Sequence, residues 1–95
     1  MKRICYLILA HTDRKHFKKL VNAINYHARF FVHIDAKTNI KEFQTLSLPE
    51  NLTFIQDRVR VSWGGISMVD ATLKLIESAL NCKEDFTNLV LLYCK

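Results

Sequence analysis

The sequence predicts an α/β fold with a mostly parallel sheet and flanking helices, and three observations support this class. Short apolar runs alternate with segments of helical periodicity along the 95 residues. Ile4–Ala10 is apolar at successive positions, and Phe30–Ile34 is apolar except at His33, as in strands covered on both faces. A hydrophobic fraction of 49% and a charged fraction of 24% exclude general disorder. Residues 1–95 are therefore expected to form one small domain or a piece of a larger one.

The first half of the chain predicts two strands separated by a helix. Ile4–Ala10 is bounded by charged residues and indicates a central strand. Thr12 or Asp13 can cap the following helix, because its side-chain oxygen accepts backbone N–H groups. Phe30–Asp35 is the second predicted strand. The apolar stripe of the helix comprises Phe17, Leu20, Val21, Ile24 and Ala28.

The segment that follows is more polar. Lys37–Leu48 predicts a short helix, with Asn39 as its cap and Pro49 in the turn that ends it. Leu52–Gln56 predicts a third short strand, and Val59–Trp63 an extended segment.

The last third of the chain predicts one helix and one strand. Gly64 and Gly65 break the chain before a helix over Ile66–Leu80. A helix that begins at Ser67 would have a capping box, Ser67-x-x-Asp70. Phe86–Tyr93 is the fourth predicted strand. The predicted apolar stripe of the helix comprises Val69, Leu73, Ile76 and Leu80. The alternation of strands and helices implies right-handed crossovers.

Charge and cysteine content limit the class of protein. The net charge of +5 suits phosphate-bearing or acidic partners, but much of it lies on one predicted helix, which favours a solvated helix face over a nucleic-acid site. The three cysteines lack CxxC spacing, and Cys5 lies in an apolar run, which indicates a reduced core residue and a reducing, cytoplasmic compartment. The histidines show no metal-type pairing. No apolar run is long enough to cross a membrane.

Two polar residues follow the first two predicted strands. His11 comes after the first strand and Asp35 ends the second, and ligands of parallel sheets settle at the carboxyl ends of the strands. Asp35 can accept hydrogen bonds from sugar hydroxyls or a base N–H, and capping the next turn is an equally good interpretation. His33 and Asp35 share one strand face and could do acid–base chemistry. No serine or cysteine elbow accompanies them, which argues against a catalytic triad.

The Gly64-Gly65 region leaves two alternatives open. It can free backbone N–H groups for an anion at a helix N-terminus, or form a tight turn that lets Trp63 pack. Arg58 and Arg60 can meet a diphosphate or lie on the surface. No GxxxxGK[ST], GxGxxG or D-x-D sequence is present, so neither a phosphate loop nor a divalent-metal site is expected. The residues alone indicate a nucleotide-binding-like α/β unit.

Three segments together resemble a known family. In order, and with fitting intervals, they are KRICYLILAHTDR, FFVHIDAKTN and RVRVSWGGISMVDATLKLIESAL. They resemble the N-terminal third of the core-2/I-branching enzyme family, the β-1,6-N-acetylglucosaminyltransferases and related xylosyltransferases of glycosyltransferase family 14. The similarity covers nearly the whole chain, and the triple of AH, HID and SWGG is fairly specific.

The resemblance implies a GT-A-type, Rossmann-like domain that binds a UDP-sugar without a metal cofactor and transfers the sugar with inversion to a glycan acceptor. Carried over by position, Ala10, His11 and Asp35 would line the uridine pocket, with Asp35 accepting from the uracil or ribose. Arg60, Val61 and Trp63 would approach the nucleotide from the next strand end. Peripheral association with a membrane stays open.

The chain departs from the family after Leu92. The family continues with a Ser-Gly-x-Asp-x-Pro-Ile type segment, whereas this chain reads Tyr93-Cys94-Lys95. The resemblance therefore implies a truncated N-terminal part that lacks the catalytic glutamate and does not transfer sugar alone. A frameshift or premature stop is one explanation, which the downstream reading frame tests. The alternative function is a noncatalytic α/β binding or interaction module.

Overall fold

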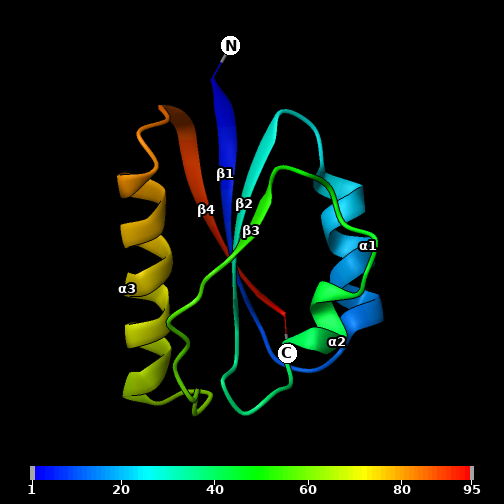
Figure 1. Cartoon of the computed structure of the whole chain (residues 1–95). Coiled ribbons are helices and arrows are strands. Elements are labelled where there is room, and N and C mark those ends of the chain that lie inside the picture. The colour runs from blue at the N-terminus through cyan, green and yellow to red at the C-terminus, as the bar shows by residue number, and fades with distance from the viewer. Residues whose placement is uncertain (1, 95) are drawn as a thin grey trace.

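The computed structural model describes residues 2–94 as a parallel sheet between two layers of helix (Figure 1). The predicted α/β, Rossmann-like class is confirmed: four strands, all parallel, have the order β3-β2-β1-β4. In chain order the elements are β1 (Arg3–Ala10), α1 (Arg14–Ile24), β2 (Ala28–Ile34), α2 (Lys41–Gln44), β3 (Leu52–Phe54), α3 (Ile66–Asn81) and β4 (Phe86–Cys94).

The helices divide between the two faces of the sheet. From β1 the chain steps through β2 to β3, with α1 and α2 on one face (Figure 1). It then crosses to β4 on the other side of β1, with α3 on the opposite face. A sheet of this kind is doubly wound, and the winding changes direction between β1 and β4.

Each face has its own apolar core. Under α1 and α2, Phe17 packs edge-on against Phe43 with ring centroids 5.4 Å apart, beside β2 residues such as Phe30. Under α3, Leu75 packs on Leu7 and other side chains of β1 and β2. Burying a side chain of this size completely stabilises the fold by about 1.5–3 kcal/mol.

Helix α1 forms largely as its sequence predicts. The carboxylate of Asp13 accepts the backbone N–H of His16 at 3.1 Å, so Asp13 is the cap. The predicted stripe is wrong at its last member, because Ala28 lies in β2. The helix ends at Ile24, and His27 takes a positive φ of 48° that turns the chain into the strand.

Helix α3 turns a different face to the sheet from the one predicted. Its buried residues are Ala71, Leu75 and Ala79, whereas Leu73 is 56% exposed. The two alanines let the helix approach the sheet closely, and a stripe of larger residues then points outward. Val69 and Leu80 are also exposed, and of the predicted stripe only Ile76, which is partly buried, packs against the core. Amphipathicity alone did not identify this face, because α3 has apolar residues on more than one side.

The capping box predicted at the start of α3 does not form. The helix begins one residue earlier, at Ile66, with Gly65 as its cap. Ser67 Oγ instead accepts the backbone N–H of Ser62 at 2.7 Å, which closes the loop before the helix. Gly64 has a φ of 89°, a conformation that favours glycine.

The polar middle of the chain has less regular structure than its sequence predicts. The helix expected over Lys37–Leu48 is only the single turn α2, where Asn39 Oδ1 accepts the N–H of Lys41 at 3.1 Å. Strand β3 ends at Phe54, although one further ladder bond joins Ile55 N–H to Val32 O at 2.8 Å. Residues 59–62 have no regular secondary structure and pair with no strand among the described residues, and Trp63, predicted to be extended, lies in the turn that follows.

The β1–β4 ladder contains one irregularity. Arg3 pairs with Phe86 but Ile4 pairs with Asn88, so Thr87 is an extra residue in β4. Beyond this bulge the register is regular to the pair of Ala10 and Cys94.

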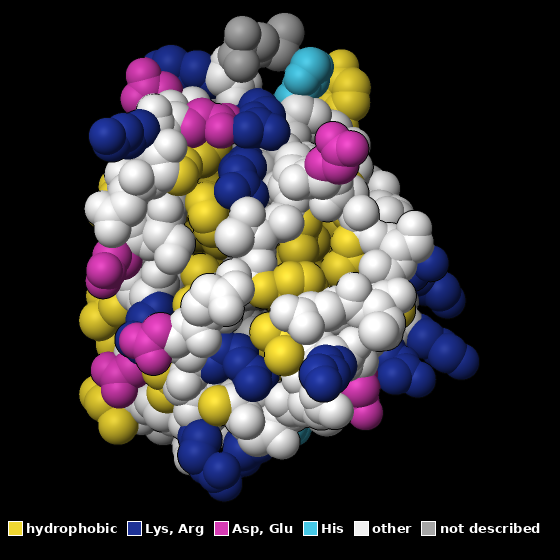
Figure 2. Space-filling model, viewed as in Figure 1, with side chains coloured by type: hydrophobic (Ala, Val, Ile, Leu, Met, Phe, Trp, Pro, Cys, Tyr) yellow, Lys and Arg dark blue, Asp and Glu magenta, His cyan; other side chains and the backbone are white. Residues whose placement is uncertain are grey.

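The two helical faces also differ in surface charge. Figure 2 shows Lys and Arg side chains gathered over α1 and acidic side chains along α3. Within residues 2–94, no helix is long and apolar enough to cross a membrane. Cys5 and Cys94 are buried free thiols and Cys82 is an exposed one. The cytoplasmic location stays a prediction.

Candidate functional site

The candidate site lies at the carboxyl ends of β1 and β2, beside the point where the winding changes direction. Parallel sheets of this kind hold ligands in the crevice at this point. The backbone joins the two strand ends directly, since Asp35 N–H donates to Ala10 O at 3.0 Å. The predicted residues Ala10, His11 and Asp35 therefore come together, as their places after neighbouring strands indicate.

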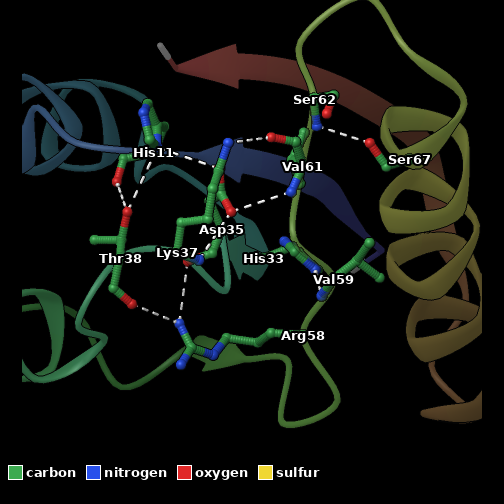
Figure 3. Close-up of polar contacts among 10 residues, drawn as sticks. All are labelled: His11, His33, Asp35, Lys37, Thr38, Arg58, Val59, Val61, Ser62 and Ser67. Atoms are coloured by element: carbon green, nitrogen blue, oxygen red, sulfur yellow. Dashed lines mark hydrogen bonds and ion pairs between the residues drawn. The ribbon is translucent and has the colours of Figure 1, made fainter.

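Asp35 is completely buried and fixes two loops through one carboxylate oxygen. Oδ1 accepts the backbone N–H of Lys37 at 3.0 Å, which closes the turn after β2. The same oxygen accepts the N–H of Val61 at 3.1 Å (Figure 3). Of the two roles left open for Asp35, the structure thus contains the turn-capping one. The contact with uracil or ribose stays a prediction.

The second carboxylate oxygen of Asp35 faces the His11 ring and the Lys37 ammonium group. Oδ2 lies 3.3 Å from His11 Nδ1 and 3.5 Å from Lys37 Nζ. Burial raises the pKa of this carboxyl. The backbone N–H groups of Lys37 and Val61 lower the pKa, as do the charges of Lys37 and His11, and their combined effect is larger than that of burial. The net pKa is lowered, so the group stays ionised at neutral pH and is a poor general base.

His11 is the partly exposed member of this cluster, with 32% of its side chain accessible. Thr38 Oγ1 donates to the backbone oxygen of His11 at 2.8 Å, so a lone pair of this hydroxyl faces His11 Nδ1 at 3.4 Å. Nδ1 therefore lies between two acceptors, Thr38 Oγ1 and Asp35 Oδ2. In the neutral ring the proton belongs on Nδ1, which leaves Nε2 as a hydrogen-bond acceptor.

The extended segment 59–61 is held against the end of β2 at alternate residues. Val59 N–H donates to His33 Nε2 at 2.9 Å, just as Val61 N–H donates to Asp35. Lys37 Nζ donates to Val61 O at 2.6 Å (Figure 3). The predicted shared face of His33 and Asp35 is confirmed, but both side chains bind backbone rather than each other. Burial lowers the pKa of His33 and keeps it neutral as an acceptor.

The remaining predicted residues lie in or next to this segment. Val61 is completely buried and Arg60 is exposed. The Trp63 ring reaches the switch point, with its centroid 6.3 Å from that of His11 and 6.1 Å from that of Tyr93 on β4. Arg58 does not point to an open diphosphate site: it donates to the backbone oxygens of Thr38 at 3.0 Å and Asp35 at 3.3 Å.

Sequence reasoning missed Lys37 and Thr38. Both side chains complete the cluster, because they bind the backbone of Val61 and His11 respectively. The sequence did contain a signal, because both residues lie in the turn directly after Asp35. An aspartate often accepts the backbone N–H two residues later, and such a turn keeps the next side chains at the same edge of the sheet as the aspartate. Among residues 2–94, no three His, Cys, Asp or Glu side chains gather as metal ligands would.

The fold and the site define a doubly wound α/β protein with a polar cluster at its switch point. A family model for the core-2/I-branching enzyme matches residues 4–94. The chain therefore belongs to the core-2/I-branching enzyme family, a glycosyltransferase family, and the predicted resemblance is confirmed. None of the curated proteins that were compared matches the chain.

Proposed function

We propose that this chain forms the nucleotide portion of a UDP-sugar site in an inverting glycosyltransferase of the β-1,6-N-acetylglucosaminyltransferase type. The observation that carries the proposal is the convergence of His11, Asp35 and the 59–63 segment at the switch point of the sheet. Family membership supplies the reaction class, with a sugar donor and a sugar acceptor as substrates. No metal is part of the proposal.

In this proposal His11 meets the base. Its Nε2 is an acceptor because Asp35 and Thr38 hold the proton on Nδ1. Uracil has an N–H donor at N3, whereas cytosine has an acceptor there. In its neutral form the His11 ring therefore favours uridine over cytidine diphosphates, and Trp63 supplies an aromatic surface next to it.

In the same proposal Asp35 has an indirect role, because it holds other groups of the pocket in place. It orients His11 and holds Val61, and so shapes the pocket, with a direct contact to uracil or ribose as its further predicted role. No residue of this chain is proposed as the catalytic base. Asp35 is unsuited to that task because its pKa is lowered and its side chain is completely buried.

Calorimetric titration tests the proposal. UDP and UDP-N-acetylglucosamine should bind weakly to the chain, CDP about tenfold more weakly, and His11→Phe should remove the difference between UDP and CDP. His11→Gln, whose amide oxygen can accept at the former Nε2 position, should restore part of it. Asp35→Ala should abolish binding; equal heat from this variant and the wild type would contradict the role of Asp35.

A noncatalytic binding or interaction module remains the second candidate function. It is favoured by the internal contacts of Asp35, whose Oδ1 accepts two backbone N–H groups and whose Oδ2 faces Lys37, since these contacts explain the carboxylate without a ligand. The absence of heat with every uridine nucleotide would support this candidate against the first. Sugar transfer by the chain alone would contradict both.

A further inference from the structure

His33 is a buried titratable side chain that has no part in the proposed function. It is completely buried and alternates along β2 with Phe31, which lies in the core beneath α3. Its Nε2 accepts the backbone N–H of Val59 at 2.9 Å (Figure 3). A ring nitrogen that accepts a hydrogen bond carries no proton, so the proton of the neutral ring is on Nδ1. His33 can therefore hold Val59 only while the ring is neutral.

The closed structure does not accommodate a charged His33 ring. A second proton would enter at Nε2, where it would face the N–H of Val59. Nδ1 is buried as well and has no hydrogen-bond partner among residues 2–94. The charged ring would thus bury N–H donors that have no acceptor, which is strongly unfavourable. The proton is accepted more easily when Val59 moves away and water reaches the ring.

Charged groups approach His33 from several parts of the chain. Asp35 lies on the same face of β2, Asp57 and Arg58 follow β3, and Lys74 comes from α3. Burial lowers the pKa of His33 most, and Arg58 and Lys74 lower it further, whereas the His33 backbone and Asp35 raise it. Access to water would remove the largest of these causes. The open arrangement therefore binds the proton more tightly than the closed one.

The other hydrogen bonds of segment 59–61 do not change at weakly acidic pH. Asp35 accepts a backbone N–H of this segment at 3.1 Å, and its lowered pKa keeps it ionised in this range. Ala36 N–H and Lys37 Nζ donate to backbone oxygens of the segment at 3.0 Å and 2.6 Å. A backbone amide does not titrate, and lysines titrate far above this range. Among the described residues that hydrogen-bond the segment, only His33 changes charge at weakly acidic pH.

We propose that His33 is a proton-sensitive positioning residue: protonation of its ring releases segment 59–61 from the end of β2, and with it the side of the site that Trp63 forms. The segment leads directly into Trp63, whose ring centroid lies 6.3 Å from that of His11. The consequence for ligand binding rests on the proposed function. Because the nucleotide pocket is complete only while His33 is neutral, the proton and the uridine nucleotide weaken each other's binding.

Trp63 is the only tryptophan of the chain and reports on the segment without any ligand. Its fluorescence should change as the pH falls from about 7.5 to about 4.5, with a midpoint below 6.5. Far-UV circular dichroism should stay constant, because the opening is local. His33→Gln, whose amide oxygen can accept at the Nε2 position but takes up no proton in this range, should abolish the change.

His11→Gln is the matched control, because it removes the other histidine next to Trp63 and should keep the transition. An unchanged signal in the wild type, a transition that persists in His33→Gln, or one that is lost in His11→Gln would overturn the proposal. A simultaneous loss of circular dichroism would overturn it as well, because the chain would then unfold as a whole.

NMR of the wild-type chain tests the same step without a substitution. The ring nitrogens of His33 report its protonation, and the Val59 amide should lose at least about tenfold in hydrogen-exchange protection over the same pH range. The Ile55 amide, which donates to Val32 O at 2.8 Å in the adjoining ladder, is the control and should stay protected. A Val59 amide that stays protected beside a charged His33, or an equal loss at Ile55, would contradict local release.

Calorimetry with UDP-N-acetylglucosamine tests the link to the site, because the phosphates of this diester do not titrate in this range. Between about pH 7.5 and a pH below the His33 midpoint, the affinity of the wild type should fall at least about fivefold more than that of His33→Gln, which retains His11. Equal falls would overturn the link. Absence of binding at every pH would contradict the proposed function, whereas the ligand-free measurements decide whether His33 releases the segment.

Discussion

Strands β2 and β4 are both rich in apolar residues but lie in opposite environments. Every residue of β2 from Phe30 to Ile34 is buried, whereas Leu89, Leu91 and Tyr93 of β4 are exposed. The difference comes from position: β2 lies between β1 and β3 under helices on both faces, while β4 is an edge strand that α3 does not cover. An apolar run thus predicts a strand, and the order of the strands decides how much of it is buried.

We expect the largest effect on the free energy of unfolding from truncating one side chain in each strand. Phe30→Ala empties a completely buried position and should lower the free energy of unfolding by about 3–5 kcal/mol. Leu91→Ala, at a position that is 38% exposed, should lower it by less than about 1 kcal/mol. Urea unfolding of both variants and the wild type measures the two losses. Equal losses would mean that β4 is covered in solution.

The carboxyl end of β2 gives the next largest effect. Asp35→Ala removes the acceptor of two backbone N–H groups and leaves Lys37 without its buried counter-charge, so we expect a loss of about 3 kcal/mol. Asp57→Ala is the matched control, because Asp57 pairs with Lys74 at 2.6 Å but its side chain is 86% exposed. The control should unfold at nearly the wild-type urea concentration; similar losses would argue against the network around Asp35.

His33 gives β2 a pH dependence in the weakly acidic range, which β4 lacks because it contains no histidine, aspartate or glutamate. Burial lowers the pKa of His33 below 6.5, and of its charged neighbours Asp35 raises it while Arg58 and Lys74 lower it. Because the unfolded chain binds the proton more tightly, stability is complete above pH 6.5 and is lost as the pH falls toward the lowered pKa.

Urea midpoints between about pH 8 and pH 5 measure this loss, whose slope is at most about 1.4 kcal/mol per pH unit for one proton. His33→Asn, which keeps an acceptor for Val59 N–H, should flatten the curve. Asp35 does not interfere in this range: its lowered pKa means that its contribution is lost only as the pH falls below 3.8. An unchanged slope in His33→Asn would assign the effect to another group.

The smallest effect concerns thiol reactivity. Cys82 is exposed and should be alkylated first, while burial raises the pKa of Cys5 to about 11 and also raises that of Cys94. Because Cys94 lies at the end of an edge strand, local opening should expose it before Cys5 in central β1. Mass spectrometry of tryptic peptides over time gives the order. Modification of Cys5 before Cys94 would contradict the comparison of edge and centre.

The sequence was sufficient to predict most strands and helices and part of the candidate site. Ile4–Ala10 and Phe86–Tyr93 each match an observed strand to within one residue, and His11 and Asp35 meet because parallel strands end at one edge. The buried face of α3 was not predictable from periodicity, since Ala71 and Ala79 give a weaker apolar signal than the leucines that point outward. Lys37 was missed because its contacts depend on how segment 59–61 folds back.

The bulge at Thr87 has a consequence for how β4 divides its side chains. Phe86 belongs to the core beneath α3, whereas Leu92 and Cys94 belong to the core beneath α1. The extra residue shifts the phase of the strand once, so that Phe86 and Leu89 point the same way despite their odd spacing. Deleting Thr87 would therefore leave the later side chains on their present faces, while inserting one residue after Asn88 would exchange them. The bulge therefore acts as a length buffer, because it takes up one residue before the regular register begins at the pair of Ile4 and Asn88.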